Sequence, residues 1–250
     1  MLFAKKSKML FLVVLAVATV ACFALQKPLR KFPAVFYLGA IVLDTLYLMG
    51  AFVGLPHGIR SVLMLLMQQC TLSLALFVVV MFVGVFRTDS FVGRWLRPIR
   101  SELSVLACLL AVGHMVLYLA TFTPRFNAGH AVNDNVAVSF GVALALLVLL
   151  LVLGVTSFAF VKRCMRSESW KRLQRFSYLF FGLIYVHLVL MLAPSALRGG
   201  AASQESMVVY SVVFVGYGVL RVVRALCDRK VSASSKADMS AAEEFEPLGA

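Results

Sequence analysis

Two histidines, His114 and His187, each lie alone inside a long apolar segment. His114 follows the basic residue Arg100 by 14 positions, and His187 follows Arg175 by 12 positions. At about 1.5 Å per helical residue, these separations correspond to about 21 and 18 Å, so we expect the two imidazoles to share one depth. Neutral imidazole binds iron, and two imidazoles can fill both axial positions of a b-type haem. The alternative for each is a hydrogen bond to a neighbouring helix.

The composition is typical of an integral membrane protein. Hydrophobic residues make up 62% of the chain, charged residues 14%, and the mean hydropathy is +0.94. A soluble domain has about 45–50% apolar and about 25% charged residues. Because an ionisable residue within a membrane segment is rare and is usually functional, both histidines are candidates for a site.

Seven segments are long enough to cross a hydrocarbon core of about 30 Å, which requires about 20 residues. They predict an all-α membrane protein with a six-helix bundle over residues 33–226. Residues 1–32 form an extra hydrophobic segment that is either a helix, which we favour, or a cleaved signal peptide. Residues 227–250 are expected to be a disordered cytoplasmic tail. The seven segments are 9–26, 33–54, 61–86, 101–123, 135–161, 176–194 and 207–226.

The basic residues alternate along the chain in a way that predicts its orientation. Of the 24 Lys and Arg residues, 18 lie in 27–31, 87–100, 162–175 and the region after 220, whereas the intervening loops hold only Arg60, Arg125 and Arg198. The positive-inside rule places the rich set, and therefore the C-terminus, in the cytoplasm. The net charge of +13 is then explained by topology and by lipid headgroups, and nucleic acid is excluded as a partner.

No motif for soluble catalysis is present in the sequence. The five cysteines are dispersed without a Cys-x-x-Cys pair, and there is no P-loop, Gly-x-Gly-x-x-Gly or Gly-x-Ser-x-Gly motif. Whether the chain is itself an enzyme is open, since any donor or acceptor domain would have to come from another chain.

Two ordered motifs carry a family resemblance. The first runs from Arg100-Ser-Glu-Leu to His114 and Tyr118, and the second combines Val155-Thr-Ser-Phe with Trp170-Lys-Arg-Leu-Gln-Arg-Phe-Ser-Tyr and His187. Over residues 33–226 the chain resembles the ferric reductase-like transmembrane domain family, and within it the haem-b membrane subunits of bacterial periplasmic methionine sulfoxide reductase systems. The resemblance implies a bacterial inner-membrane protein that passes electrons through haem b from a quinol or flavin donor to an extracytoplasmic acceptor or partner reductase.

Two positions depart from the family pattern. Gln174 stands where relatives have the first histidine of the later pair, and Ser101 stands at the matching position before His114. The resemblance therefore implies a single haem in the outer half of the membrane, with His114 and His187 as its iron ligands.

Several other residues are candidates for this site. Gly113 and Gly182, with Ala107 and Ala111, would leave room for a porphyrin, and Tyr118 and Phe180 would wall it. Asp44 would relay a proton from a quinol or, as we favour, pack within the bundle. Gln68 and Gln69 are expected to bond between helices first, and the loop residues His57 and His130 to be solvated.

A haem-free multipass transporter or membrane scaffold is the alternative function. It would retain the same helices without a cofactor. The sequence shows no sign of inverted repeats or paired broken helices, which transporters often contain.

Overall fold

The computed structural model describes the backbone of residues 2–87, 89–127 and 134–244, and the side chains of 10–87, 89–127 and 134–229. Every regular element in these ranges is a helix. In a bilayer the backbone polar groups must be satisfied within the segment, and helices do this. The expected all-α class is therefore confirmed.

Five helical stretches in the described part of the chain are long and apolar enough to cross a membrane. Their outward faces carry exposed aliphatic side chains, among them Val148, Val155, Val186 and Val212, as contact with lipid requires. The chain is thus a multi-pass helical protein whose surface suits membrane lipid. The stretches are α3 (Pro33–Phe52), α6 (Phe91–Leu96) with the 3₁₀ turn η2 (Arg97–Ile99) and α7 (Arg100–Asn127), α8 (Asp134–Ser157), α10 (Ser167–Gln174) with α11 (Phe176–Leu197), and α12 (Ala201–Glu244).

The continuous helix expected over 61–86 is instead broken, which corrects the sequence prediction. The segment consists of α4 (His57–Leu63), a π-helical turn η1 (Met64–Gln68) and α5 (Thr71–Val83), and the two parts are bent by 41°. The break falls at Cys70, whose φ of 55° lies in the left-handed region that an α-helix cannot contain. If the bent pair forms one span, the number of crossings rises to six.

The N-terminal segment is helical and packs within the bundle. Helix α1 (Leu2–Ala24) lies against α5 and α12, and it is followed by the short α2 (Gln26–Lys31). Phe11, Val14, Ala18 and Cys22 are buried in its contacts. Their spacing of three or four residues places them on one face of α1, so removal of this segment would uncover core side chains.

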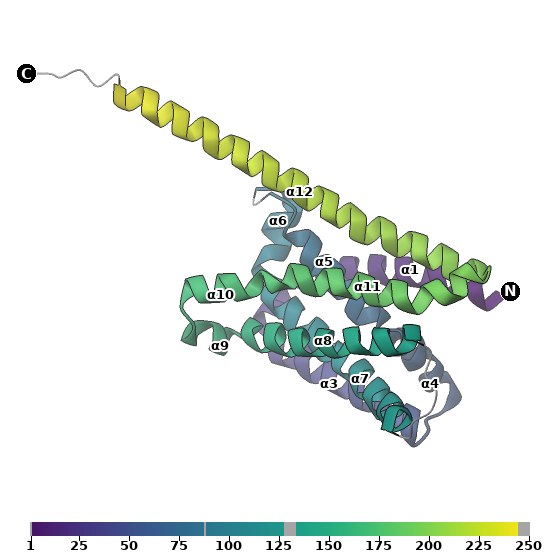
Figure 1. The fold of residues 1–250 in the computed structure, drawn as a ribbon. Helices are drawn as coiled ribbons and strands as arrows, with labels where there is room; N and C mark the ends of the chain where they lie inside the picture. Colours follow the sequence, from purple (N-terminus) through teal and green to yellow (C-terminus); the bar gives the residue numbers. More distant parts are fainter. Residues whose placement is uncertain (1, 88, 128–133, 245–250) are drawn as a thin grey trace, which may run out of the picture.

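Helix α7 packs against α3, α5 and α8. Helix α11 lies between α8 and α12 (Figure 1). A buried hydrogen bond from Ser73 Oγ to the Ala107 carbonyl, 2.7 Å long, joins α5 to α7. Ala107 is therefore a close-packing residue and has no open space beside it.

The last helix extends well past the other helices (Figure 1). Helix α12 continues to Glu244, through most of the segment 227–250 for which we expected disorder. Alanine is frequent in this part of the sequence and is the residue that favours helix most strongly, which gives a physical reason for the difference.

Candidate functional site

His114 is held by the break in the neighbouring helix. It lies in the middle of α7, and its Nδ1 is 2.8 Å from the carbonyl oxygen of Gln68, the last residue of η1. A carbonyl oxygen only accepts, so Nδ1 must carry the proton and donate it. In the neutral ring the lone pair then belongs to Nε2, which is the nitrogen left to bind a metal.

His187 is held in a similar way by a different helix. Its Nδ1 is 3.0 Å from the hydroxyl oxygen of Ser139 on α8 and 3.2 Å from the carbonyl oxygen of the same residue. Ser139 is fully buried between α8 and α11. In the tautomer that donates from Nδ1 to this carbonyl, the lone pair of His187 belongs to Nε2.

The two imidazoles form a matched donor pair. They come from α7 and α11, and each makes a hydrogen bond through Nδ1 to another element of the bundle. Metal-binding histidines characteristically donate their second N–H to a backbone carbonyl or similar acceptor, which fixes the ring and its tautomer. The described residues contain no group of three or more metal-ligating side chains, but axial ligation of haem requires only two imidazoles. Each imidazole also makes the hydrogen bond to a neighbouring helix that the sequence analysis gave as the alternative to haem ligation.

Gly113 has a different role from the one expected from the sequence. A Cβ atom at this position would lie 2.5 Å from Asp44 Oδ1, and the Gly113 N–H donates to Asp44 Oδ2 over 3.2 Å. The missing side chain thus accommodates a carboxylate from α3, and the same space is not available to a porphyrin. Ala111, two residues before Gly113, is likewise buried in helix packing.

The Asp44 carboxyl group is only partly satisfied. Its side chain is 9% exposed, and among the described residues Oδ1 has no hydrogen-bond partner. The hydroxyl of Tyr47, one turn further along α3 and fully buried, also has no described partner. A buried polar atom without a partner is costly, so this pair is an uncommon feature beside the His114 helix.

The other predicted wall residues are separated by the structure. The ring centres of Tyr118 and His114 lie 4.6 Å apart, and Tyr118 in turn stacks on Phe122, so Tyr118 contacts the first histidine. Phe180 is buried edge-on against Phe77 in a different region of the bundle. Gly182 is exposed on α11 with open space around it, and no packed element lies beside it.

The remaining polar candidates contribute no side chain to this site. Gln68 and Gln69 have exposed side chains, and only the backbone carbonyl of Gln68 contacts His114. His57 is exposed at the start of α4, as expected of a loop histidine. His130 lies outside the described residues.

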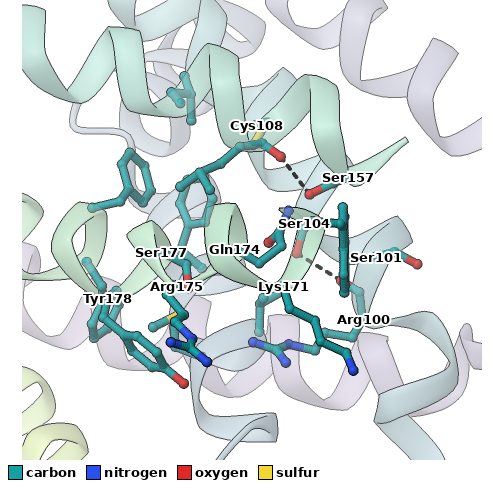
Figure 2. A pocket seen from close by; sticks show the side chains of 18 of the residues that line it. Arg100, Ser101, Ser104, Cys108, Ser157, Lys171, Gln174, Arg175, Ser177 and Tyr178 are labelled. Atoms are coloured by element: carbon teal, nitrogen blue, oxygen red, sulfur yellow. Dashed lines mark hydrogen bonds between the residues drawn. The ribbon is translucent and has the colours of Figure 1, made fainter. Parts of the chain in front are cut away.

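A cavity of about 360 Å³, not foreseen from the sequence, lies at the other end of the same helices (Figure 2). Ser101 and Gln174, the two positions that depart from the family pattern described above, line it. Gln174 Nε2 donates to Thr156 Oγ1 over 3.3 Å, so this residue serves a contact between α10 and α8. The only feature of the sequence that could have indicated this cavity is the group of basic residues that line it.

Comparisons with known proteins do not assign a function. No protein-family model and no solved structure matches the chain. An uncharacterised protein of Treponema pallidum (strain Nichols) is 35% identical over 218 residues, which cover 86% of this chain and 60% of that protein. The chain therefore spans about 60% of the length of the relative it matches.

Proposed function

We propose that the chain is a membrane electron-transfer subunit that binds one haem b between His114 and His187. The observation that carries the proposal is that both histidines use Nδ1 for a hydrogen bond inside the bundle, which leaves Nε2 of each for iron. This arrangement is the one that fixes histidine ligands in metal sites. Haem b, when bound, would supply one-electron redox chemistry, while the chain supplies its position and its environment.

The residues around the pair have distinct tasks in this proposal. The Gln68 carbonyl and Ser139 orient the two imidazoles, and the ring of Tyr118 packs beside His114. The apolar helices around them exclude water. Asp44 packs against the Gly113 N–H, and its second oxygen is available to hold a proton near the site.

Electrons would enter from a quinol or a flavin donor and leave to an extracytoplasmic acceptor or a partner reductase. The chain is proposed to lie in a bacterial inner membrane with its C-terminus in the cytoplasm, on the basis of its alternating basic segments. A partner chain would have to donate the electrons to this chain, accept them from it, or both.

The test is the reduced-minus-oxidised absorption spectrum of the full chain purified in a mild detergent. A haem-b difference spectrum is expected, and it should be lost in His114→Ala and in His187→Ala. His57→Ala is the matched control, because this histidine is exposed at the start of α4. A chain that lacks haem after expression with adequate haem supply would contradict the proposal.

A haem-free transporter or scaffold is the second candidate, and one observation favours it. The π-helical turn and left-handed Cys70 break the second span beside the buried carboxyl of Asp44. Broken membrane helices with freed backbone groups commonly form substrate or ion sites in transporters. Equilibrium binding of ²²Na⁺ to the haem-free protein, with Asp44→Asn as the comparison, would distinguish this candidate.

A further inference from the structure

The cavity at the basic end of the helices combines an apolar floor with a cationic rim. Its volume of about 360 Å³ falls within the range of about 300–1,000 Å³ typical of small-ligand sites. Phe77, Val80, Phe180 and Phe181, all buried, contribute to the floor. Five cationic residues line the cavity, and no carboxylate is among the described residues that do so: Arg97, Arg100, Lys162, Lys171 and Arg175.

Two of the five cations already have partners within the protein. Arg97 Nη2 donates to the Phe86 carbonyl over 2.6 Å, and Lys162 Nζ lies 4.4 Å from the centre of the Trp170 ring. The side chains of Arg100, Lys171 and Arg175 donate no hydrogen bond to a residue that the structure describes. Figure 2 shows these three side chains reaching the same side of the cavity.

The positive charge at this end of the bundle is only partly offset, since Glu102 accepts a hydrogen bond from Ser101 while no carboxylate is among the described residues that line the cavity. Arg97 and Arg221 are both close enough to Arg100 to repel it. Arg221 is engaged elsewhere, because it donates to the hydroxyl of Tyr178 and to the carbonyl of Gly84. An anion bound between Arg100, Lys171 and Arg175 would relieve this repulsion. A guanidinium group can donate two parallel hydrogen bonds to two oxygens of one phosphate.

Hydroxyl groups complete the polar side of the cavity. Ser101, Ser104, Ser157 and Ser177 line it together with the amide of Gln174 (Figure 2). Ser101 donates to Glu102 Oε2, and Ser104 and Ser157 donate to carbonyls of their own helices, so the cationic side chains must supply most of the donors to an anion. The cavity has no histidine and no free carboxylate among these residues, so it is poorly suited to a metal.

We propose that this cavity binds a phosphate group attached to an apolar body, held by Arg100, Lys171 and Arg175 above the aromatic floor. The same chemistry is offered by an anionic phospholipid headgroup at the membrane surface and by a soluble phosphate compound from the aqueous side. The proposal does not require haem, and its failure would leave the histidine site untouched.

The test uses Trp170, which lines the cavity, as a fluorescent reporter. The chain contains two tryptophans, so Trp95→Phe makes Trp170 the single reporter in the full-length protein. One arm titrates inorganic phosphate against chloride at equal ionic strength, in detergent. The other arm uses vesicles of phosphatidylcholine that contain phosphatidylglycerol with brominated chains, which quench a tryptophan in contact with them.

The matched variants remove equal charge from two sets of basic residues, one that lines the cavity and one that does not. The cavity variant is Arg100→Gln, Lys171→Gln, Arg175→Gln, and the control variant is Arg163→Gln, Arg166→Gln, Arg172→Gln, whose residues are exposed and do not line the cavity. Helicity and gel filtration check that both fold. Should the cavity variant not fold, the single change Arg175→Gln replaces it, with an expected loss of about threefold or more in affinity.

A saturable response is expected that weakens at least tenfold in the cavity variant and less than twofold in the control. Saturation by inorganic phosphate would identify a soluble phosphate ligand. Quenching by brominated phosphatidylglycerol that millimolar phosphate does not reverse would identify a lipid headgroup. No saturable response in either arm, or equal loss in both triple variants, would overturn the proposal.

Discussion

The two histidine side chains are the same chemically, but different hydrogen-bond partners hold them in position. His114 Nδ1 donates a hydrogen bond to the carbonyl of Gln68. The break in the α4–α5 segment positions this carbonyl. His187 is bound by Ser139 in the uninterrupted helix α8, through both the hydroxyl and the carbonyl. One site thus depends on irregular backbone and the other on a side chain that can be removed by a single substitution.

This difference predicts which kind of substitution would disturb the hydrogen bond of each histidine. A carbonyl in a regular helix can accept a second hydrogen bond through its other lone pair, as that of Ser139 does, whereas the Gln68 carbonyl lies at the end of a π-helical turn. The surroundings of His114 include this turn, the left-handed Cys70 and the buried Asp44. The surroundings of His187 contain none of these. Changes to backbone geometry should therefore affect the first histidine, and loss of a hydroxyl should affect the second.

The largest effect is expected from Gly113→Ala. The added Cβ would lie 2.5 Å from Asp44 Oδ1, and overpacking of this kind costs about 1–3 kcal/mol of unfolding free energy. Thermal unfolding in detergent measures the loss. Gly141→Ala is the control, because nothing lies within 4 Å of its Cβ position. Adding Asp44→Ala should restore most of the stability, and a double variant no more stable than Gly113→Ala would contradict this explanation.

A smaller effect is expected from Cys70→Val. A β-branched residue at a φ of 55° is strained, so the variant should lose about 1–2 kcal/mol of unfolding free energy. Cys70→Gly should be as stable as the natural chain or more stable, because glycine adopts this conformation without strain. The comparison is made by thermal unfolding in the same detergent. Equal destabilisation by both substitutions would show that the thiol contacts, and not the backbone, matter here.

The smallest effect is expected from Ser139→Ala, measured as the haem retained per chain. Loss of a group that orients a metal-binding histidine typically weakens binding 10–100-fold. Since the Ser139 carbonyl remains 3.2 Å from Nδ1, we expect a loss near tenfold. Gln68→Ala should change nothing, because His114 uses only the backbone of that residue. A similar loss in both variants would remove the contrast between the two histidines.

Most of the fold follows from the hydropathy of the sequence. The helices over Pro33–Phe52, Arg100–Asn127, Asp134–Ser157 and Phe176–Leu197 match the expected segments within a few residues. Long apolar runs of this length have few alternatives in a bilayer. The break at Cys70 was not predictable, because neither glycine nor proline marks it and the segment stays apolar on both sides. The only feature of the sequence that accompanies the break is the polar pair Gln68–Gln69, directly before Cys70.

The candidate site was predictable in its residues but not in its contacts. The isolation of His114 and His187 in apolar segments singled them out, whereas Ser139 is one of many serines and gave no signal. Gly113 looked like space for a cofactor, but the carboxylate of Asp44 occupies that space. Such assignments depend on which helices are neighbours, and periodicity within one helix does not contain that information. The haem itself stays a prediction.

The most direct test of the central claim is the low-temperature electron paramagnetic resonance spectrum of the oxidised full-length protein. A haem iron bound by two imidazoles is expected to give one low-spin ferric signal. That signal should disappear in both His114→Ala and His187→Ala and persist in His57→Ala. A protein without haem, or a low-spin signal that survives unchanged in either of the first two variants, would contradict the account.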